Sequence, residues 1–99
     1  MPEDPLEVFE ALDPELLKTV VNARELALSD GALPSKYKYL IAMALDAAKG
    51  SERGVAGLAQ DAMQAGASRE EIAEALRVAY FVGGAGSIYT AAHGLTGLL

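Results

Sequence analysis

The sequence predicts an all-α protein, a single-domain antiparallel helical bundle of about five to six helices that spans residues 1–99. Apolar residues recur at helical spacing in one segment after another, and no segment alternates with a period of two. Ser, Asp, Pro and Gly stand at the segment boundaries, where helix caps need them. The connections are two to six residues long, which favours antiparallel neighbours.

The first half of the chain contains two predicted helices behind a short acidic segment. Residues 2–12 are expected to form a helical turn or two at most. A helix is predicted to begin at Asp13 and Pro14, which suit its N-cap and first position. Residues 29–31 (Ser-Asp-Gly) end this helix. The next helix begins after Pro34 and ends at the Lys49–Gly50 pair. Its apolar stripe is the clearest in the chain: Tyr37, Leu40, Ile41, Ala44, Leu45 and Ala48.

The second half contains three more predicted helices. Ser51 can cap the first of them. Gly66 suits the positive φ that ends it, and Ser68 with Glu71 forms a capping box for the next helix. That helix, over residues 66–82, is apolar on nearly every side, so we expect it at the centre of the bundle. A break at residues 83–86 (Gly-Gly-Ala-Gly) precedes a last helix from about Ser87 to Gly97.

Composition and charge exclude several classes of function. The net charge is −6, which gives nucleic acid no basic surface to bind. The chain has no cysteine, which excludes disulfides, thiolate catalysis, cysteine-type zinc sites and iron–sulfur clusters. With one histidine, a multi-histidine metal site would need several chains. We therefore predict neither a metal nor a cofactor.

The stretch from Val78 to Leu99 contains no Asp, Glu, Lys or Arg and is long enough to span a membrane. Five glycines and several polar residues interrupt it, so a buried hairpin that a neighbouring subunit partly covers explains it better. We expect a homo-oligomer and no membrane insertion. The N-terminus lacks the pattern of a signal peptide, which predicts a cytoplasmic protein.

His93 is the only side chain expected to titrate near neutral pH, and Tyr89 lies four residues earlier on the same helix face. The two residues are candidates for a general acid/base and an orienting phenol. The alternative is a structural histidine near a helix end, stabilised by the helix dipole. The glycines of residues 83–86 match no phosphate-binding fingerprint, because no strand precedes them. Tyrosines could line a pocket for a small molecule.

Several motifs occur in an order that resembles the carboxymuconolactone decarboxylase-like family, which includes the alkylhydroperoxidase D type. They are Asp-Pro-Glu-Leu at 13–16, Gly-Ala-Leu-Pro at 31–34, Gly-Ala-Ser-Arg-Glu-Glu-Ile at 66–72, and Gly83. The resemblance covers nearly the whole chain. It implies a bundle of the alkylhydroperoxidase D-like type, assembled as a trimer or hexamer.

Thiol-active members of that family carry Cys-x-x-Cys-x-x-x-His before the Gly-Ala-Ser turn, and a glutamate on the preceding helix. The resemblance places those positions on Ser51, Gly54 and Leu58, with the glutamate near Tyr39. All four residues are non-functional substitutions, which predicts that the isolated chain is no thiol peroxidase. The decarboxylase branch also lacks the cysteine pair.

Three hypotheses follow. The first is a non-thiol member that serves as a small-ligand-binding or assembly module. The second is an enzyme of the lactone-decarboxylase type with His93 as general acid/base. The third is a peroxiredoxin-type oxidoreductase in family name only.

Overall fold

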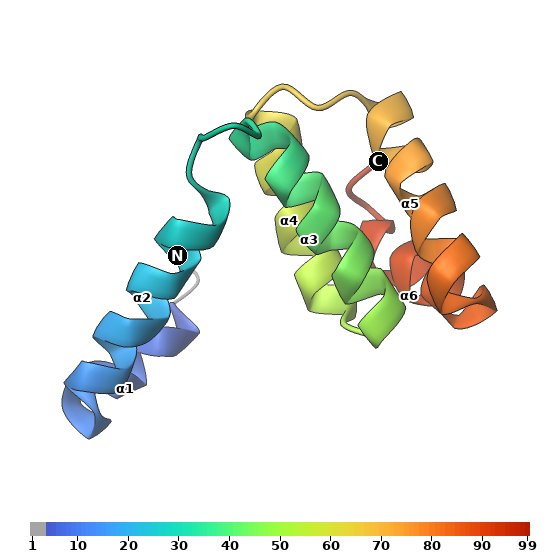
Figure 1. The fold of residues 1–99 in the computed structure, drawn as a ribbon. Coiled ribbons are helices and arrows are strands. Elements are labelled where there is room, and N and C mark those ends of the chain that lie inside the picture. Colours follow the sequence, from blue (N-terminus) through green and yellow to red (C-terminus); the bar gives the residue numbers. More distant parts are fainter. Residues whose placement is uncertain (1–3) are drawn as a thin grey trace.

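A computed structural model describes residues 4–99 and shows the predicted succession of helices (Figure 1). The start of the acidic segment, residues 1–3, lies outside the described residues. The elements are η1 (Pro5–Glu7), α1 (Val8–Leu12), α2 (Pro14–Leu28), α3 (Ser35–Lys49), α4 (Glu52–Gln64), α5 (Arg69–Gly83) and α6 (Ala85–Leu95). Residues 4–99 contain no strand. The all-α prediction is confirmed.

The predicted helix starts are formed by the expected caps. The Asp13 carboxylate accepts a hydrogen bond from the Leu16 N–H at 3.0 Å, and the Ser51 hydroxyl accepts one from the Gly54 N–H at 3.2 Å. Ser68 and Glu71 form both hydrogen bonds of the capping box, at 3.0 and 2.9 Å. Each cap satisfies an N–H that the first helical turn leaves without a partner.

Glu71 also joins α5 to α3. One of its carboxylate oxygens accepts from the Ser68 N–H, and the other lies 3.1 Å from the Lys36 ammonium. The hydrogen bond from the Ser68 backbone and the contact with Lys36 both lower the pKa of Glu71, and the same contact raises the pKa of Lys36. The cap of α5 is therefore part of the contact between the two helices.

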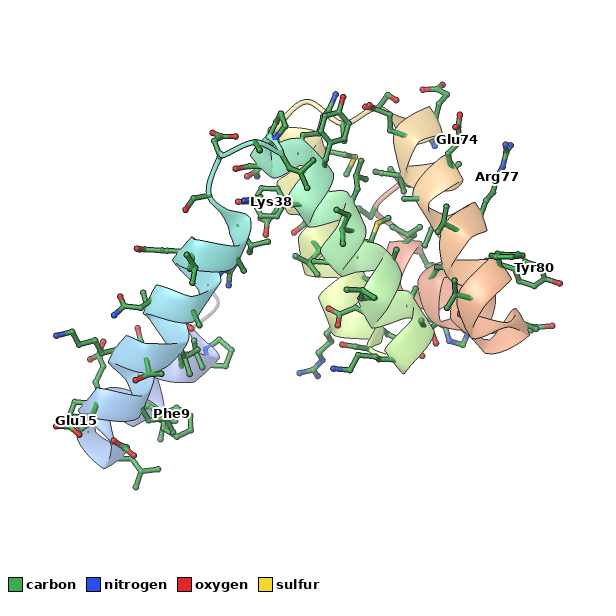
Figure 2. The ribbon with its side chains drawn as sticks, viewed as in Figure 1. Phe9, Glu15, Lys38, Glu74, Arg77 and Tyr80 are labelled. Atoms are coloured by element: carbon green, nitrogen blue, oxygen red, sulfur yellow. The ribbon has the colours of Figure 1, made fainter. Side chains whose placement is uncertain are left out.

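The centre of the bundle is α3, and our expectation that the helix over residues 66–82 would be central is wrong. α3 packs against α4, α5 and α6, whereas α5 packs mainly on α3 and α6. Figure 2 shows Glu74, Arg77 and Tyr80 projecting from the outer side of α5. Val78, Phe81 and Val82 are exposed as well. The buried core consists of Leu40, Met43, Ala47, Val55, Ala59, Ala62, Ala67, Ile72, Leu76, Ala79 and Ala91.

Small residues allow the helices to approach closely. A Cβ atom on Gly94 of α6 would lie 2.6 Å from the Glu52 carbonyl oxygen of α4 and 3.0 Å from the Val55 Cβ. A Cβ atom on Gly83 would lie 2.9 Å from the Ala48 Cβ of α3. Close helix packing therefore requires glycine at positions 83 and 94.

The turn between α5 and α6 is tighter than the glycine-rich sequence suggested. α5 continues through Gly83, only Gly84 (φ +80°) stands between the helices, and α6 begins at Ala85 rather than near Ser87. Ser87 is buried and donates a hydrogen bond to the Ala79 carbonyl at 3.3 Å. This bond ties the first turn of α6 to the preceding helix.

The N-terminal helices stand apart from the bundle. η1, α1 and α2 form a hairpin that projects away from α3–α6 in Figure 1, and no residue of these three elements is buried. We call residues 4–28 the arm. The chain is thus an all-α helical bundle, as predicted, in which α3–α6 form the core and the N-terminal helices form a splayed arm.

Among the described residues, no helix is both long enough and apolar enough to cross a membrane. The uncharged stretch over residues 78–99 is divided between the end of α5 and α6.

Candidate functional site

Two adjoining hollows separate α2 from α3 and α4. One, of about 460 Å³, lies over the connection of α2 to α3 and reaches Tyr39. The other, of about 360 Å³, lies between α2, the end of α3 and α4, and reaches Leu58. Arg24 and Leu28 of α2 line both hollows, so we treat them as one site, the α2 cleft. The remaining lining residues are Val21, Glu25, Ser29, Asp30, Ser35, Asp46, Arg53, Gly54, Gly57 and Asp61.

The carboxylate of Asp46 covers the N-terminal turn of α4. A Cβ atom placed on Gly54 would lie only 2.7 Å from the Asp46 Cγ and 2.7 Å from the Ser51 hydroxyl oxygen. Gly54 therefore provides the space that the Asp46 side chain occupies. Ser51, Gly54 and Asp46 meet at one point on the wall of the cleft.

The cleft carries charges of both signs. The Arg24 guanidinium on α2 lies 3.5 Å from the Asp61 carboxylate on α4, and this pair closes one side of the opening. Arg53 and Asp46 also line the hollow, and neither belongs to an ion pair within residues 4–99. Because the Arg24–Asp61 pair is partly exposed, it can open at small cost in free energy.

Hydrogen bonds at the other end of the cleft position the end of α2. The Asp30 carboxylate accepts from the Ser35 N–H at 2.7 Å, and this bond is the main cause of the lowered pKa of Asp30. The Ser35 hydroxyl donates to the Leu28 carbonyl at 2.7 Å, and the Lys38 ammonium donates to the Ser29 carbonyl at 2.7 Å. The end of α2 is thus held by polar contacts rather than by a buried core.

The structure places His93 beside a carboxylate that the sequence did not point to. The His93 Nδ1 atom lies 3.0 Å from the Glu52 Oε2 atom, which joins the last turn of α6 to the first turn of α4. Both side chains are exposed, at 66% for His93 and 54% for Glu52. Tyr89 is also exposed, one turn before His93. Neither His93 nor Tyr89 lines the α2 cleft.

Comparison with known proteins identifies the family. The model of the carboxymuconolactone decarboxylase family matches residues 14–96, which is most of the chain. The chain belongs to the carboxymuconolactone decarboxylase family. A solved structure of an apo carboxymuconolactone decarboxylase family protein from Legionella pneumophila, lpg0406, is similar, with 37% sequence identity and a TM-score of 0.85. The similarity covers 92% of this chain and 81% of the Legionella protein. No curated protein matches the chain.

The cleft coincides with the positions that the family resemblance singled out. Gly54, Leu58 and Tyr39 line it, and Ser51 caps the adjacent helix α4. In a carboxymuconolactone decarboxylase family protein with cysteines at positions 51 and 54, the two side chains would stand side by side at the start of α4. Here a hydroxyl, a hydrogen atom and the Asp46 carboxylate fill that space.

Sequence reasoning found the positions of the cleft but missed the groups that give it its present chemistry. Arg24, Asp46 and Asp61 lie on three different helices, and their charges resemble those of ordinary surface residues in the sequence. Glu52 stands 41 residues before His93, so no local pattern could have paired them. Residues 4–99 contain no cluster of three or more His, Cys, Asp or Glu residues able to hold a metal ion.

Proposed function

We propose that this chain is a non-thiol member of the carboxymuconolactone decarboxylase family that binds a small molecule in the α2 cleft. One observation carries the proposal. Asp46 and Arg53 line the same hollow as Gly54 and Leu58, the positions at which thiol-active family members carry reactive groups. Neither charged residue belongs to an ion pair within residues 4–99. Thiol-active members carry a cysteine and a histidine at positions 54 and 58, whereas this chain presents charged groups to the hollow.

The lining residues favour a small ligand that carries both a carboxylate and a hydrogen-bond donor. Arg53 offers a guanidinium to a carboxylate, and Asp46 offers an acceptor to an ammonium or hydroxyl group. Leu28 and Leu58 supply apolar surface. A volume of about 360 Å³ is at the lower end of the range for ligand pockets, which favours amino acids and small hydroxy acids.

Calorimetric titration with a panel of amino acids and small hydroxy acids tests the binding proposal. Arg53→Gln and Asp46→Asn should each weaken binding of the best ligand at least tenfold, because each leaves one charged group of the ligand without its partner. Arg69→Gln is the matched control, since Arg69 lies on α5 away from the cleft. Equal losses in the control and in the cleft variants, or no binding by any compound, would contradict the proposal.

The proposal includes the absence of thiol peroxidase activity in the isolated chain. Peroxide reduction by the family's route needs a thiolate nucleophile and a second thiol that resolves the sulfenic acid, and the chain has no cysteine. The assay is peroxide consumption with a dithiol reductant. Wild-type turnover above the reductant-only blank would refute this part.

A gain-of-function variant is the positive control, and the structure specifies its design. Ser51→Cys, Gly54→Cys, Leu58→His and Tyr39→Glu restore the family's groups, but a cysteine at position 54 collides with Asp46. Asp46→Ala is added as well, because a carboxylate beside the new thiols would suppress the reactive thiolate. Higher activity in the five-fold variant than in the four-fold variant that retains Asp46 is the expected result.

A second candidate function is an enzyme of the lactone-decarboxylase type, and the contact between His93 and Glu52 favours it. A carboxylate at hydrogen-bond distance fixes the orientation and tautomer of an imidazole, as a general acid requires. When a lactone acid decarboxylates, the bond to the carboxylate carbon breaks, carbon dioxide leaves, and the electron pair left on carbon takes a proton. His93 could supply that proton, with Tyr89 nearby on the same helix.

Turnover of a carboxylated lactone separates the two functions. Activity that Glu52→Gln lowers and His93→Asn abolishes would establish the enzyme. No turnover, with ligand binding intact in His93→Asn, would leave the binding function alone. No residue of the α2 cleft carries a thiol, so the cleft does not support a peroxiredoxin-type activity.

We further propose that the chain forms a homo-oligomer, trimeric or hexameric as the family resemblance implies. The support is the apolar surface at the corner of α5 and α6, where Phe81, Val82 and Tyr89 are 87%, 78% and 70% exposed. Water-exposed aromatic surface of this kind is typical of interfaces between subunits. Size-exclusion chromatography with light scattering should give a multiple of 10.3 kDa, and a mass of 10.3 kDa would refute self-association.

A further inference from the structure

Contacts within the arm (residues 4–28) do not explain why its helices are stable. Its helices are short, and no residue in them is buried. Isolated helices shorter than about 12 to 15 residues are marginal in water, and in proteins most helical stability comes from packing of an apolar face. The arm has such a face, since Leu16 and Val20 lie one turn apart on α2 and are 44% and 40% exposed. These helices therefore need a surface that residues 4–99 of one chain do not give them.

The chain exposes more solvent-accessible surface than a compact protein of its mass. A compact monomer of this mass exposes about 5,400 Å², whereas this chain exposes 6903 Å². The radius of gyration is 14.3 Å, against about 13 Å for a compact domain of this length. The excess of roughly 1,500 Å² is comparable to what a stable protein–protein interface buries.

The bundle carries an apolar surface that fits a helix. Tyr37, Ile41 and Leu45 recur every four residues along α3 and form an exposed ridge, which we call the α3 stripe. A hollow of about 400 Å³ flanks it on the α5 side and reaches Val78, and one of about 340 Å³ flanks it on the α2 side and reaches Ala27. The sequence assigns these three residues to the clearest apolar stripe in the chain, and a partner that covers the ridge would bury them.

Charge favours packing of the arm on the bundle rather than on another arm. Residues 4–28 carry six acids and two bases, for a net charge of −4, whereas residues 29–99 carry seven acids and six bases, for a net charge of −1. Two arms side by side would repel each other more strongly than an arm and the nearly neutral bundle would.

We propose that the arm of one copy packs its α2 apolar face on the α3 stripe of a second copy. The contact is heterologous, so it closes either as a reciprocal exchange between two chains or as a ring. The inference rests on the self-association proposed above and adds which surfaces meet. It also gives α2, which forms one wall of the α2 cleft, a support from outside its own chain.

Cross-linking tests the inference cleanly because the chain has no native cysteine. A tagged Val20→Cys chain and an untagged Ile41→Cys chain are co-expressed and treated with a short bis-maleimide, so that a product of mixed size can form only between copies. Leu26→Cys paired with Ile41→Cys is the matched control, since Leu26 lies on the opposite, polar side of α2. Circular dichroism confirms that each variant is folded.

The mixed Val20–Ile41 product should exceed the Leu26–Ile41 control at least fivefold. Equal yields in an oligomeric protein would overturn arm exchange and leave self-association standing. A dominant Val20–Val20 product would overturn it in favour of contact between arms. A monomeric mass would refute both proposals, and ligand titration tests the α2 cleft separately.

Discussion

Replacement of Gly94 by alanine tests the close approach of α4 and α6 that brings His93 to Glu52. The added Cβ atom would lie 2.6 Å from the Glu52 carbonyl oxygen and 3.0 Å from the Val55 Cβ. Backbone and a buried β-branched residue cannot move aside easily, and overpacking of this kind costs about 1–3 kcal/mol. Alanine also favours the helix by about 1 kcal/mol relative to glycine, which partly offsets the loss.

Gly57→Ala on α4 is the control that isolates the steric effect. A Cβ atom at position 57 meets no other atom within 4 Å, so this variant gains the helix propensity without the clash. The two variants should therefore differ in free energy of unfolding by about 1–3 kcal/mol, with Gly57→Ala the more stable. Denaturant unfolding at a fixed protein concentration measures the difference, because self-association makes midpoints depend on concentration. Equal stability of the two variants would refute the close approach of α4 and α6.

Three further predictions follow from other contacts. Leu76→Ala should lower the free energy of unfolding by about 2–5 kcal/mol, because Leu76 lies in the core and is only 9% exposed. Ser68→Ala should lower it by about 1 kcal/mol through loss of the α5 cap. The reverse ranking of denaturant midpoints would show that the core is misassigned. Glu71→Gln keeps a capping oxygen but removes the charge that faces Lys36. Because folding lowers the pKa of Glu71, the wild type should be the more stable above pH 4.5 and lose that advantage as the pH falls through the lowered pKa; a difference that persists in strong acid would contradict this. His93→Asn should change stability and leave ligand binding in the α2 cleft intact, and calorimetry that shows lost binding in a folded variant would place His93 in the binding site.

The sequence predicted the helices well because their signals are local. Asp13, Ser51 and the Ser68–Glu71 box each act within three residues of their partners, and all formed as expected. The exact turn into α6 was harder, since Gly83 and Gly86 suit a helix as well as a break when neighbouring helices pack closely. Only Gly84 takes the positive φ between the two helices.

The faces of the helices were predicted less well, for a physical reason. Apolar periodicity records which side chains avoid water but does not say whether their own chain covers them. α3 is apolar on two sides, so the core side with Met43 and the exposed side with Ile41 look alike in the sequence. The candidate site depends on contacts between helices, such as those of Asp46 with the space at Gly54, and local patterns carry no record of these.

The position of Asp46 over Gly54 makes the order of mutations matter. From this sequence, a single change of Gly54 to cysteine would force the carboxylate aside and leave a negative charge next to the new thiol. A nearby carboxylate raises the pKa of a thiol and suppresses its reactive thiolate, so that first step would not by itself give a reactive cysteine. Loss of Asp46 would have to come before gain of the cysteine for selection to favour each step. The contact between Asp46 and the space at Gly54 therefore makes the effect of a cysteine at position 54 depend on the residue at position 46.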